Sequence, residues 1–231
     1  MENSKETGRA TAILLELKKH YPRVPALFLN YTTDAQMLCS IILSAQSTDA
    51  QVNKVTEKLF KKYKTSGDFA HAEPKVFRKE IHSTGYFNSK TKRVIGCFKI
   101  IEREHKGIIP KTMDALIALP GVGRKTANLV LANKGVVEGI AVDTHVFRLS
   151  QRLGFSAYNT PQKVEQDLMK LFDKKHWSQI NGLLISHGRA VCTARNPKCG
   201  KCFLNNKKLC PRIDLLNKYL SNSSSVLLLW Q

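Results

Sequence analysis

A lysine and an aspartate in the middle of the chain have the residue types needed for covalent chemistry. Lys125 follows Arg124 at the end of Leu119-Pro-Gly-Val-Gly-Arg-Lys, where a helical pattern begins. A lysine amine is nucleophilic only when neutral, and a cationic neighbour and a helix N-terminus both favour the neutral form. Two cations that contact phosphate would show the same spacing, so both interpretations stay open. Asp143 precedes Thr144-His-Val and is suited to a reacting carboxylate or to a helix N-cap.

The segment ahead of Lys125 has the composition of an anion-binding turn. Gly121 and Gly123 permit a tight turn and let a ligand approach the backbone without Cβ atoms in the way. The helix that follows begins with unpaired N–H groups and the positive end of its dipole, which together favour a phosphate. A helix–helix turn that needs glycine for geometry alone is the alternative.

Four cysteines near the C-terminal end have the spacing of a metal site, Cys192-x6-Cys199-x2-Cys202-x7-Cys210. Such a set of thiolates can hold zinc or a four-iron four-sulfur cluster. The spacing by itself favours zinc. The remaining cysteines, Cys39 and Cys97, lie in apolar helical patterns and are expected to be buried thiols.

The charge balance indicates a polyanionic partner. The 231 residues include 37 Lys plus Arg and 18 Asp plus Glu, which gives a net charge of +19. Cations that could contact a phosphate backbone cluster in the cysteine region, at Arg195, Lys198 and Lys201. No run approaches the roughly 18 apolar residues of a membrane span, and the N-terminus has no secretory signal. We therefore expect an intracellular protein, in the cytoplasm or nucleoid, with no membrane partner.

Most of the chain shows the periodicity of amphipathic helix, which predicts an all-α protein with short connections. Asp34 is expected to cap the second helix. The segment after 213 is expected to be a mobile extension. Helices are expected at 11–19, 35–46, 49–64, 74–81, 89–105, 112–118, 125–134, 144–153, 161–172 and 177–192.

The hairpin with its lysine, the segment Val142-Asp-Thr-His-Val-Phe-Arg and the cysteine cluster occur in an order that resembles the endonuclease III family. These proteins are helix-hairpin-helix DNA glycosylases, and the resemblance runs from about residue 10 to about residue 213. It implies an all-α, two-lobed fold with a C-terminal iron–sulfur cluster loop. The lobes would be 24–135 with the hairpin and 1–23 plus 136–213 with the cluster, followed by the extension 214–231. Lys125 and Asp143 would face the groove between the lobes.

The resemblance also assigns chemistry. Lys125 would attack C1′ of the damaged nucleotide and form a Schiff base, and β-elimination would then cut the strand. Asp143 would stabilise the cationic sugar as the base leaves. Relatives that only release the base usually lack this lysine, so the resemblance implies a bifunctional glycosylase and AP lyase. The cysteines would hold a 4Fe–4S cluster, although the family spacing is 6-2-5 and the last gap here is seven.

Two further positions match the family. Gln46 would fill the space left by a flipped nucleotide and contact the orphan base. Tyr86 would be a wedge that holds the base stack open. The residues alone favour a polar residue at a helix C-terminus for Gln46. For Tyr86, an ordinary aromatic of the core is the alternative and has nearly as much support.

The implied function is base excision repair of duplex DNA, with removal of oxidised pyrimidines of the thymine glycol type and cleavage at the abasic site. The expected partner is double-stranded DNA with damaged bases or abasic sites, bound by a monomer. One alternative is a glycosylase of the same fold for uracil or thymine in G mismatches. Another is a non-catalytic DNA-binding or redox-sensing iron–sulfur protein.

Overall fold

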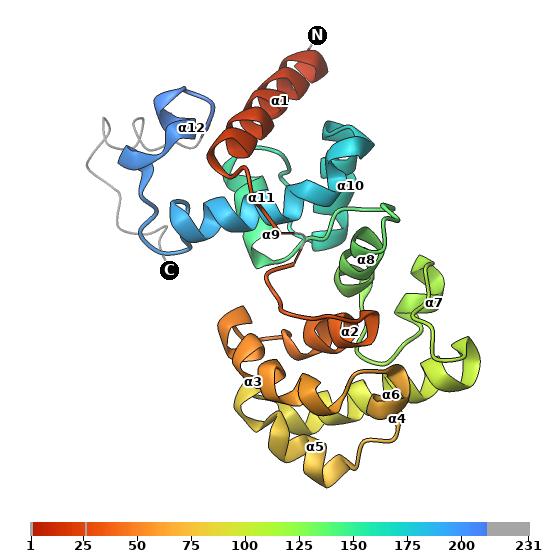
Figure 1. Ribbon diagram of the computed structural model, residues 1–231. Helices are drawn as coiled ribbons and strands as arrows, with labels where there is room; N and C mark the ends of the chain where they lie inside the picture. The colour runs from red at the N-terminus through yellow and green to blue at the C-terminus, as the bar shows by residue number, and fades with distance from the viewer. Residues whose placement is uncertain (1, 26, 212–231) are drawn as a thin grey trace. The chain divides into compact units, whose positions relative to one another are not determined.

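The computed structural model describes residues 2–25 and 27–211, which form helices joined by short loops (Figure 1). No β-strand occurs among these residues, so the all-α prediction is confirmed. Within the same part of the chain, no helix combines the length and the apolar character needed to cross a membrane. The predicted extension 214–231 lies outside the described residues.

The helices divide into two compact units. One unit is residues 25–138, and the other joins the residues up to 24 with those from 139 onward. The first contains α2 (Asp34–Leu43), α3 (Asp49–Lys62), α4 (Ser66–Ala70), α5 (Pro74–Glu80), α6 (Phe87–His105), α7 (Met113–Ile117) and α8 (Arg124–Asn133). The second contains α1 (Glu2–His20), α9 (Thr144–Arg152), α10 (Pro161–Leu171), α11 (Trp177–Ala190) and α12 (Phe203–Asn206).

The 25–138 unit is built around α6, which contacts α2, α4 and α5 (Figure 1). Its apolar side chains recur every three or four residues, so one face of the helix is buried. Four aromatic rings fill the space between these helices. Phe69 stacks on Phe98 with centroids 4.7 Å apart, and Phe77 and Tyr63 complete the group with edge and stacked contacts. These contacts pack α6 against the helices on either side of Tyr63, Phe69 and Phe77.

The second unit has its own apolar core, formed by α1, α9, α10 and α11. Ile13, Leu17, Val146, Leu149 and Leu183 are each at most 2% exposed. The core also reaches Cys202 and Leu204 in the loop after α11. The cysteine loop is therefore packed onto the helices rather than suspended from one end of them.

The cap predicted for α2 is wrong by one residue. Thr33 has the extended backbone of an N-cap, and its Oγ1 accepts a hydrogen bond from Gln36 N at 3.2 Å. Asp34 is the first helical residue, and its carboxylate pairs with Lys134 instead. Both residue types cap helices well, so their order in the sequence did not decide between them.

Several predicted helix ends also differ. The second helix was expected to reach Gln46, but α2 ends at Leu43, where Ser44 donates its hydroxyl to the Ile41 carbonyl. The first helix begins at Glu2 rather than at residue 11. Two short helices, α4 and α12, were not predicted, because five and four residues are too few to show a helical period.

Candidate active site

The turn between α7 and α8 is the hairpin expected from Leu119-Pro-Gly-Val-Gly. Leu119 and Val122 are buried, 2% and 5% exposed, and Val122 N donates to the Leu119 carbonyl at 3.1 Å. Gly121 has φ +82°, a conformation that residues with a Cβ rarely adopt. A Cβ there would also lie 2.9 Å from the Cβ of Arg93. Gly123 has an ordinary backbone and open space around its missing Cβ, so the turn is accessible at this point.

Replacing Gly121 by alanine is expected to lower the free energy of unfolding by about 2 kcal/mol or more. The cost has two sources, the left-handed backbone and the contact with Arg93. Thermal or urea unfolding measures it. Gly123→Ser is the matched control, because serine is a good N-cap and its Cβ meets no atom within 4 Å. Equal stability of the two variants would contradict the role assigned to the Gly121 backbone.

Lys125 is the second residue of α8, directly after the hairpin. Its side chain is half-buried, whereas the neighbouring Arg124 is exposed. The N-cap, Gly123, offers no side chain to the first backbone N–H groups of α8. These N–H groups and the helix dipole therefore face an accessible turn, next to two cations. This arrangement suits an anionic ligand.

Asp143 is the N-cap of α9, so that interpretation of the sequence is confirmed. Its Oδ1 accepts a hydrogen bond from Val146 N at 2.8 Å. The segment before Asp143 is held by Asn181 of α11, whose amide donates to the Ala141 carbonyl at 2.8 Å. The carboxylate is half-buried and rigidly placed, with its second oxygen outside this cap bond. Capping and a role in chemistry are compatible in this geometry.

The four cysteines border one cavity in the second unit. Cys192, Cys199, Cys202 and Cys210 line it together with Arg152 and His187. All six cysteines fall within the described residues, and none forms a disulfide. The other two, Cys39 and Cys97, are fully buried as predicted, and burial raises the pKa of Cys97 to about 12.

Arginines of α1 and α9 hold the two ends of the cysteine loop. Arg152 donates to Cys192 Sγ at 3.4 Å and to the Thr193 carbonyl at 2.7 Å. Arg148 donates to the Cys192 carbonyl at 3.1 Å. Arg9 donates to the carbonyls of Leu153 and Leu209. The loop is thereby anchored at its first cysteine and just before its last.

His187 connects the loop to Tyr21, the residue that follows α1. Its Nε2 lies 3.6 Å from Cys202 Sγ, and its Nδ1 lies 3.1 Å from the Tyr21 hydroxyl. Burial lowers the pKa of His187 to about 4, so the ring is neutral at physiological pH. A Cys202 thiolate that held a metal group would have no proton to donate. In that state Nε2 would donate to Cys202, and Nδ1 would accept from the Tyr21 hydroxyl.

The donor set fits a metal group. Four thiols border one cavity, and side-chain nitrogens of Arg152 and His187 lie near the sulfurs of Cys192 and Cys202. Four cysteines can hold zinc or an iron–sulfur cluster, so both alternatives stay open at this point.

The predicted basic residues of the loop are partly available to a ligand. Arg195, Lys198 and Lys201 are exposed. Lys207, which belongs to the same basic sequence, pairs with Glu16 of α1 at 2.6 Å and lowers the pKa of that carboxyl. Lys207 therefore contributes to holding the loop on α1.

Gln46 and Tyr86 lie in two loops of the 25–138 unit, and both have a left-handed backbone. Gln46 has φ +53° and is exposed, three residues after the end of α2. Tyr86 has φ +47° and is 67% exposed, so it is not a core aromatic. Non-glycine residues in this conformation cost of order 1–3 kcal/mol and concentrate at functional sites.

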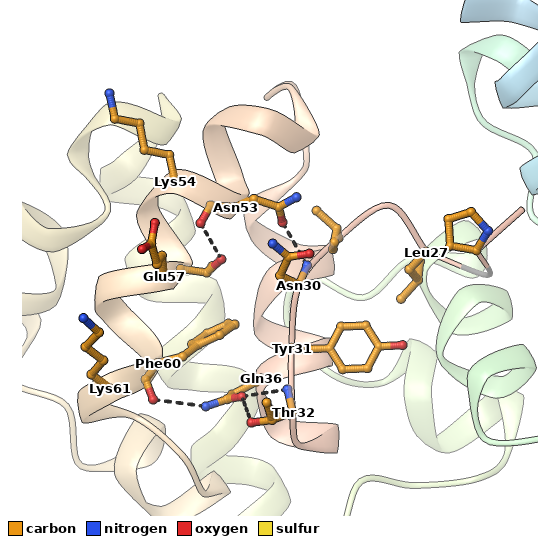
Figure 2. Close-up of a pocket in the computed structure, with 13 residues that line it drawn as sticks. Leu27, Asn30, Tyr31, Thr32, Gln36, Asn53, Lys54, Glu57, Phe60 and Lys61 are labelled. Carbon is orange, nitrogen blue, oxygen red and sulfur yellow. Dashed lines mark hydrogen bonds between the residues drawn. The ribbon is translucent and has the colours of Figure 1, made fainter. Parts of the chain in front are cut away.

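A groove of about 800 Å³ also opens in the 25–138 unit, between α3 and the segment ahead of α2 (Figure 2). Its amide side chains are engaged with the backbone. Asn53 donates to the Phe28 carbonyl and accepts from Asn30 N, and Gln36 accepts from Thr32 N. These bonds hold the segment in place, and none of the predicted site residues lines the groove.

Two family descriptions match the chain. One, the HhH-GPD superfamily base excision DNA repair protein, covers residues 39–174. The other, the iron–sulfur binding domain of endonuclease III, covers residues 192–206. The endonuclease III of Synechocystis sp. is 49% identical over 205 residues, 88% of this chain and 92% of that protein. The chain belongs to the endonuclease III family.

Solved structures of endonuclease III agree with this assignment. A non-covalent endonuclease III–DNA complex matches with a TM-score of 0.85 and 36% identity, over 92% of this chain and 98% of the other. A trapped endonuclease III–DNA covalent intermediate matches with a TM-score of 0.85 and 36% identity, over 91% and 98%. As a member of the endonuclease III family, the chain is a base excision repair DNA glycosylase with AP lyase activity. The alternative of a non-catalytic protein is thereby excluded.

The match to the iron–sulfur domain identifies the cofactor of the cysteine loop as an iron–sulfur cluster and sets the zinc alternative aside. It includes Cys192, Cys199 and Cys202 and ends at residue 206, before Cys210. The match therefore ends between Cys202 and Cys210, where this chain has seven residues and the family spacing has five.

The residues that support this endonuclease III site were not all predicted. Arg148 and Arg152 lie four residues apart on α9, and their spacing places them on one helix face. His187 continues the buried stripe of Ile180 and Leu183 on α11, which could have indicated that it is buried.

Proposed function

We propose that this endonuclease III family member removes oxidised pyrimidines of the thymine glycol type from duplex DNA and cuts the resulting abasic site through a Schiff base on Lys125. The observation that supports this most directly is the place of Lys125. It is a half-buried amine in the first turn of α8, behind a glycine hairpin and beside Arg124. A nucleophilic lysine needs such surroundings to lose its proton near neutral pH.

The proposed chemistry follows from the amine. Nζ of Lys125 forms a bond to C1′, and the glycosidic bond breaks as the base leaves with the electron pair. Opening of the sugar gives a protonated imine between Nζ and C1′. The imine acidifies the C2′ proton, whose loss is followed by rupture of the C3′–O bond, so the strand is cut 3′ to the lesion.

Asp143 is proposed to stabilise the positive charge that develops on the sugar and to accept, as a general base, the proton that the Lys125 amine loses. Its cap bond to Val146 fixes the carboxylate before substrate arrives, so little reorganisation accompanies the reaction. Gln46 is proposed to contact the orphan base, and Tyr86 to occupy the opened stack.

The four cysteines are proposed to hold a 4Fe–4S cluster, which when bound supplies a rigid cross-link for the loop. Iron and sulfide analysis of the purified protein tests the cluster type. The exposed cations of the loop, Arg195, Lys198 and Lys201, are then proposed to contact DNA phosphates. A loop held in place loses little entropy on binding. The logarithm of the association constant should fall with the logarithm of salt concentration by about 0.9 per phosphate neutralised.

A panel of duplexes with one lesion each tests the substrate. We expect base release from thymine glycol to be at least about tenfold faster, in kcat/KM, than from uracil or thymine opposite guanine. An undamaged duplex of the same sequence is the control for binding. A duplex with one abasic site is the control for lyase activity. Faster release from the G mismatches would instead favour a glycosylase of the same fold for uracil or thymine in G mismatches. Equal rates throughout would contradict a preference for oxidised pyrimidines.

A further inference from the structure

Lys90 is a lysine whose side chain is almost completely enclosed in the 25–138 unit, with 2% of its surface exposed. It lies in the first turns of α6. Its Nζ donates to Ser47 Oγ and to the Thr84 carbonyl, both at 2.7 Å. These acceptors are uncharged, and burial lowers the pKa of Lys90 to about 8. An ammonium group is costly to bury, so packing alone does not account for a lysine here.

The two acceptors of Lys90 belong to different loops. Ser47 follows α2, and Thr84 precedes α6. Ser47 Oγ also donates directly to the Thr84 carbonyl, so Lys90, Ser47 and Thr84 form a closed set of three hydrogen bonds. Gln51 of α3 adds a second link between the same regions, since its amide donates to Ser83 Oγ at 2.8 Å.

Each loop carries one exposed side chain on a left-handed backbone. Gln46 is adjacent to Ser47, and Tyr86 is two residues after Thr84. A non-glycine residue keeps this conformation only when its surroundings hold it. The hydrogen bonds around Lys90 act on the residues next to both strained positions, from inside the unit.

We propose that Lys90 is a positioning residue that fixes the separation of the Gln46 and Tyr86 loops, so that both side chains enter the duplex together when a nucleotide is extruded. This inference rests on the roles proposed above for Gln46 and Tyr86. Lys90 itself does not touch DNA, because its Nζ is enclosed and bound to the loops. It acts by setting the distance between two side chains that must work in one step.

The test compares strand cleavage at an abasic site in a duplex with cleavage at the same site in a single strand. A single strand has no base stack to open and no opposite base, so its cleavage does not require the two loops. Lys90→Met removes the donor and keeps a long side chain, and Ser47→Ala removes one acceptor and leaves the lysine. Thr91→Val is the matched control, because Thr91 is the next buried residue of α6 and its hydroxyl makes no hydrogen bond in the described structure.

We expect Lys90→Met to slow duplex cleavage by about tenfold or more and to change single-strand cleavage by less than about twofold. Ser47→Ala should also lower the ratio of duplex cleavage to single-strand cleavage. The loss in the double variant should be smaller than the sum of the two single losses in free energy, because both changes break one hydrogen-bond network. The fluorescence of 2-aminopurine opposite the abasic site should drop in the same variants, since unstacking is impaired. Thr91→Val should behave as wild type.

An unchanged ratio of duplex to single-strand cleavage would overturn the proposal, and so would an equal loss on both substrates, which would show a purely structural role. If Lys90→Met does not fold, Ser47→Ala decides the outcome by the same ratio. The abasic substrate contains no damaged base. A wrong lesion preference would therefore appear only in the wild-type lesion panel and would not affect this comparison.

Discussion

Lys125→Ala is expected to abolish strand cleavage at an abasic site, with a loss of at least about 10³-fold, while DNA affinity falls by no more than about tenfold. The reason is that the amine forms the covalent bond to C1′, whereas its charge is one of many in a protein of net charge +19. Single-turnover cleavage at saturating enzyme separates the chemistry from binding, and a titration of labelled duplex gives the affinity.

Lys111→Ala is the matched control for this experiment. Lys111 is an exposed lysine of the same unit, just ahead of α7, so the variant loses the same charge away from the hairpin. Its single-turnover cleavage should equal that of wild type. Residual cleavage near the wild-type rate in Lys125→Ala would remove the lysine from the proposed mechanism. Loss of binding together with cleavage would point to a role in holding DNA.

Asp143→Asn is expected to slow base release by about 10²-fold or more with little change in stability, because charge stabilisation in the reaction is lost while asparagine remains a good N-cap. Asp143→Ala should show the same loss of activity and in addition a lower free energy of unfolding, by about 1 kcal/mol, because the bond to Val146 N disappears. Single-turnover base release and urea unfolding of both variants measure the two effects separately.

The pair of Asp143 variants distinguishes the two functions of one side chain. If Asp143→Asn released the base at the wild-type rate, the aspartate would be a cap only. If both variants lost stability equally, asparagine would not replace the cap, and the activity loss could not be assigned to charge. A change in activity without a change in stability for Asp143→Asn is the result that supports a role in chemistry.

The helical framework was predictable because each helix repeats its signal over several turns. The stripe of Val94, Phe98 and Ile101 identifies α6, and α9 was expected at 144–153 and is found at Thr144–Arg152. Helix ends were less certain, since neighbouring polar residues compete to cap them. Thr33 and Asp34 show this, because either type can serve and only the backbone conformation decides.

The hairpin and the four cysteines could be found from their spacing in the sequence. The side chains that hold them in place could not. Arg152 contacts Cys192 across a separation of 40 residues, and no local pattern links the two. The left-handed backbones of Gln46 and Tyr86 were also out of reach, because a non-glycine residue takes this conformation when distant contacts hold it. The burial of Lys90 was predictable, but its hydrogen-bond partners were not. Lys90 lies four residues before Val94 on the buried stripe of α6, so the helical period itself indicates burial.

Borohydride trapping on a duplex with one abasic site is the most direct measurement of the mechanism. Borohydride reduces an imine to a stable amine, so an enzyme–DNA covalent complex reports the Schiff base. We predict a covalent complex with wild-type protein, attachment of the sugar to Lys125 by peptide mass spectrometry, and no complex with Lys125→Ala. A complex that persists in the variant, or a sugar attached to another lysine, would contradict the assignment of Lys125 as the nucleophile.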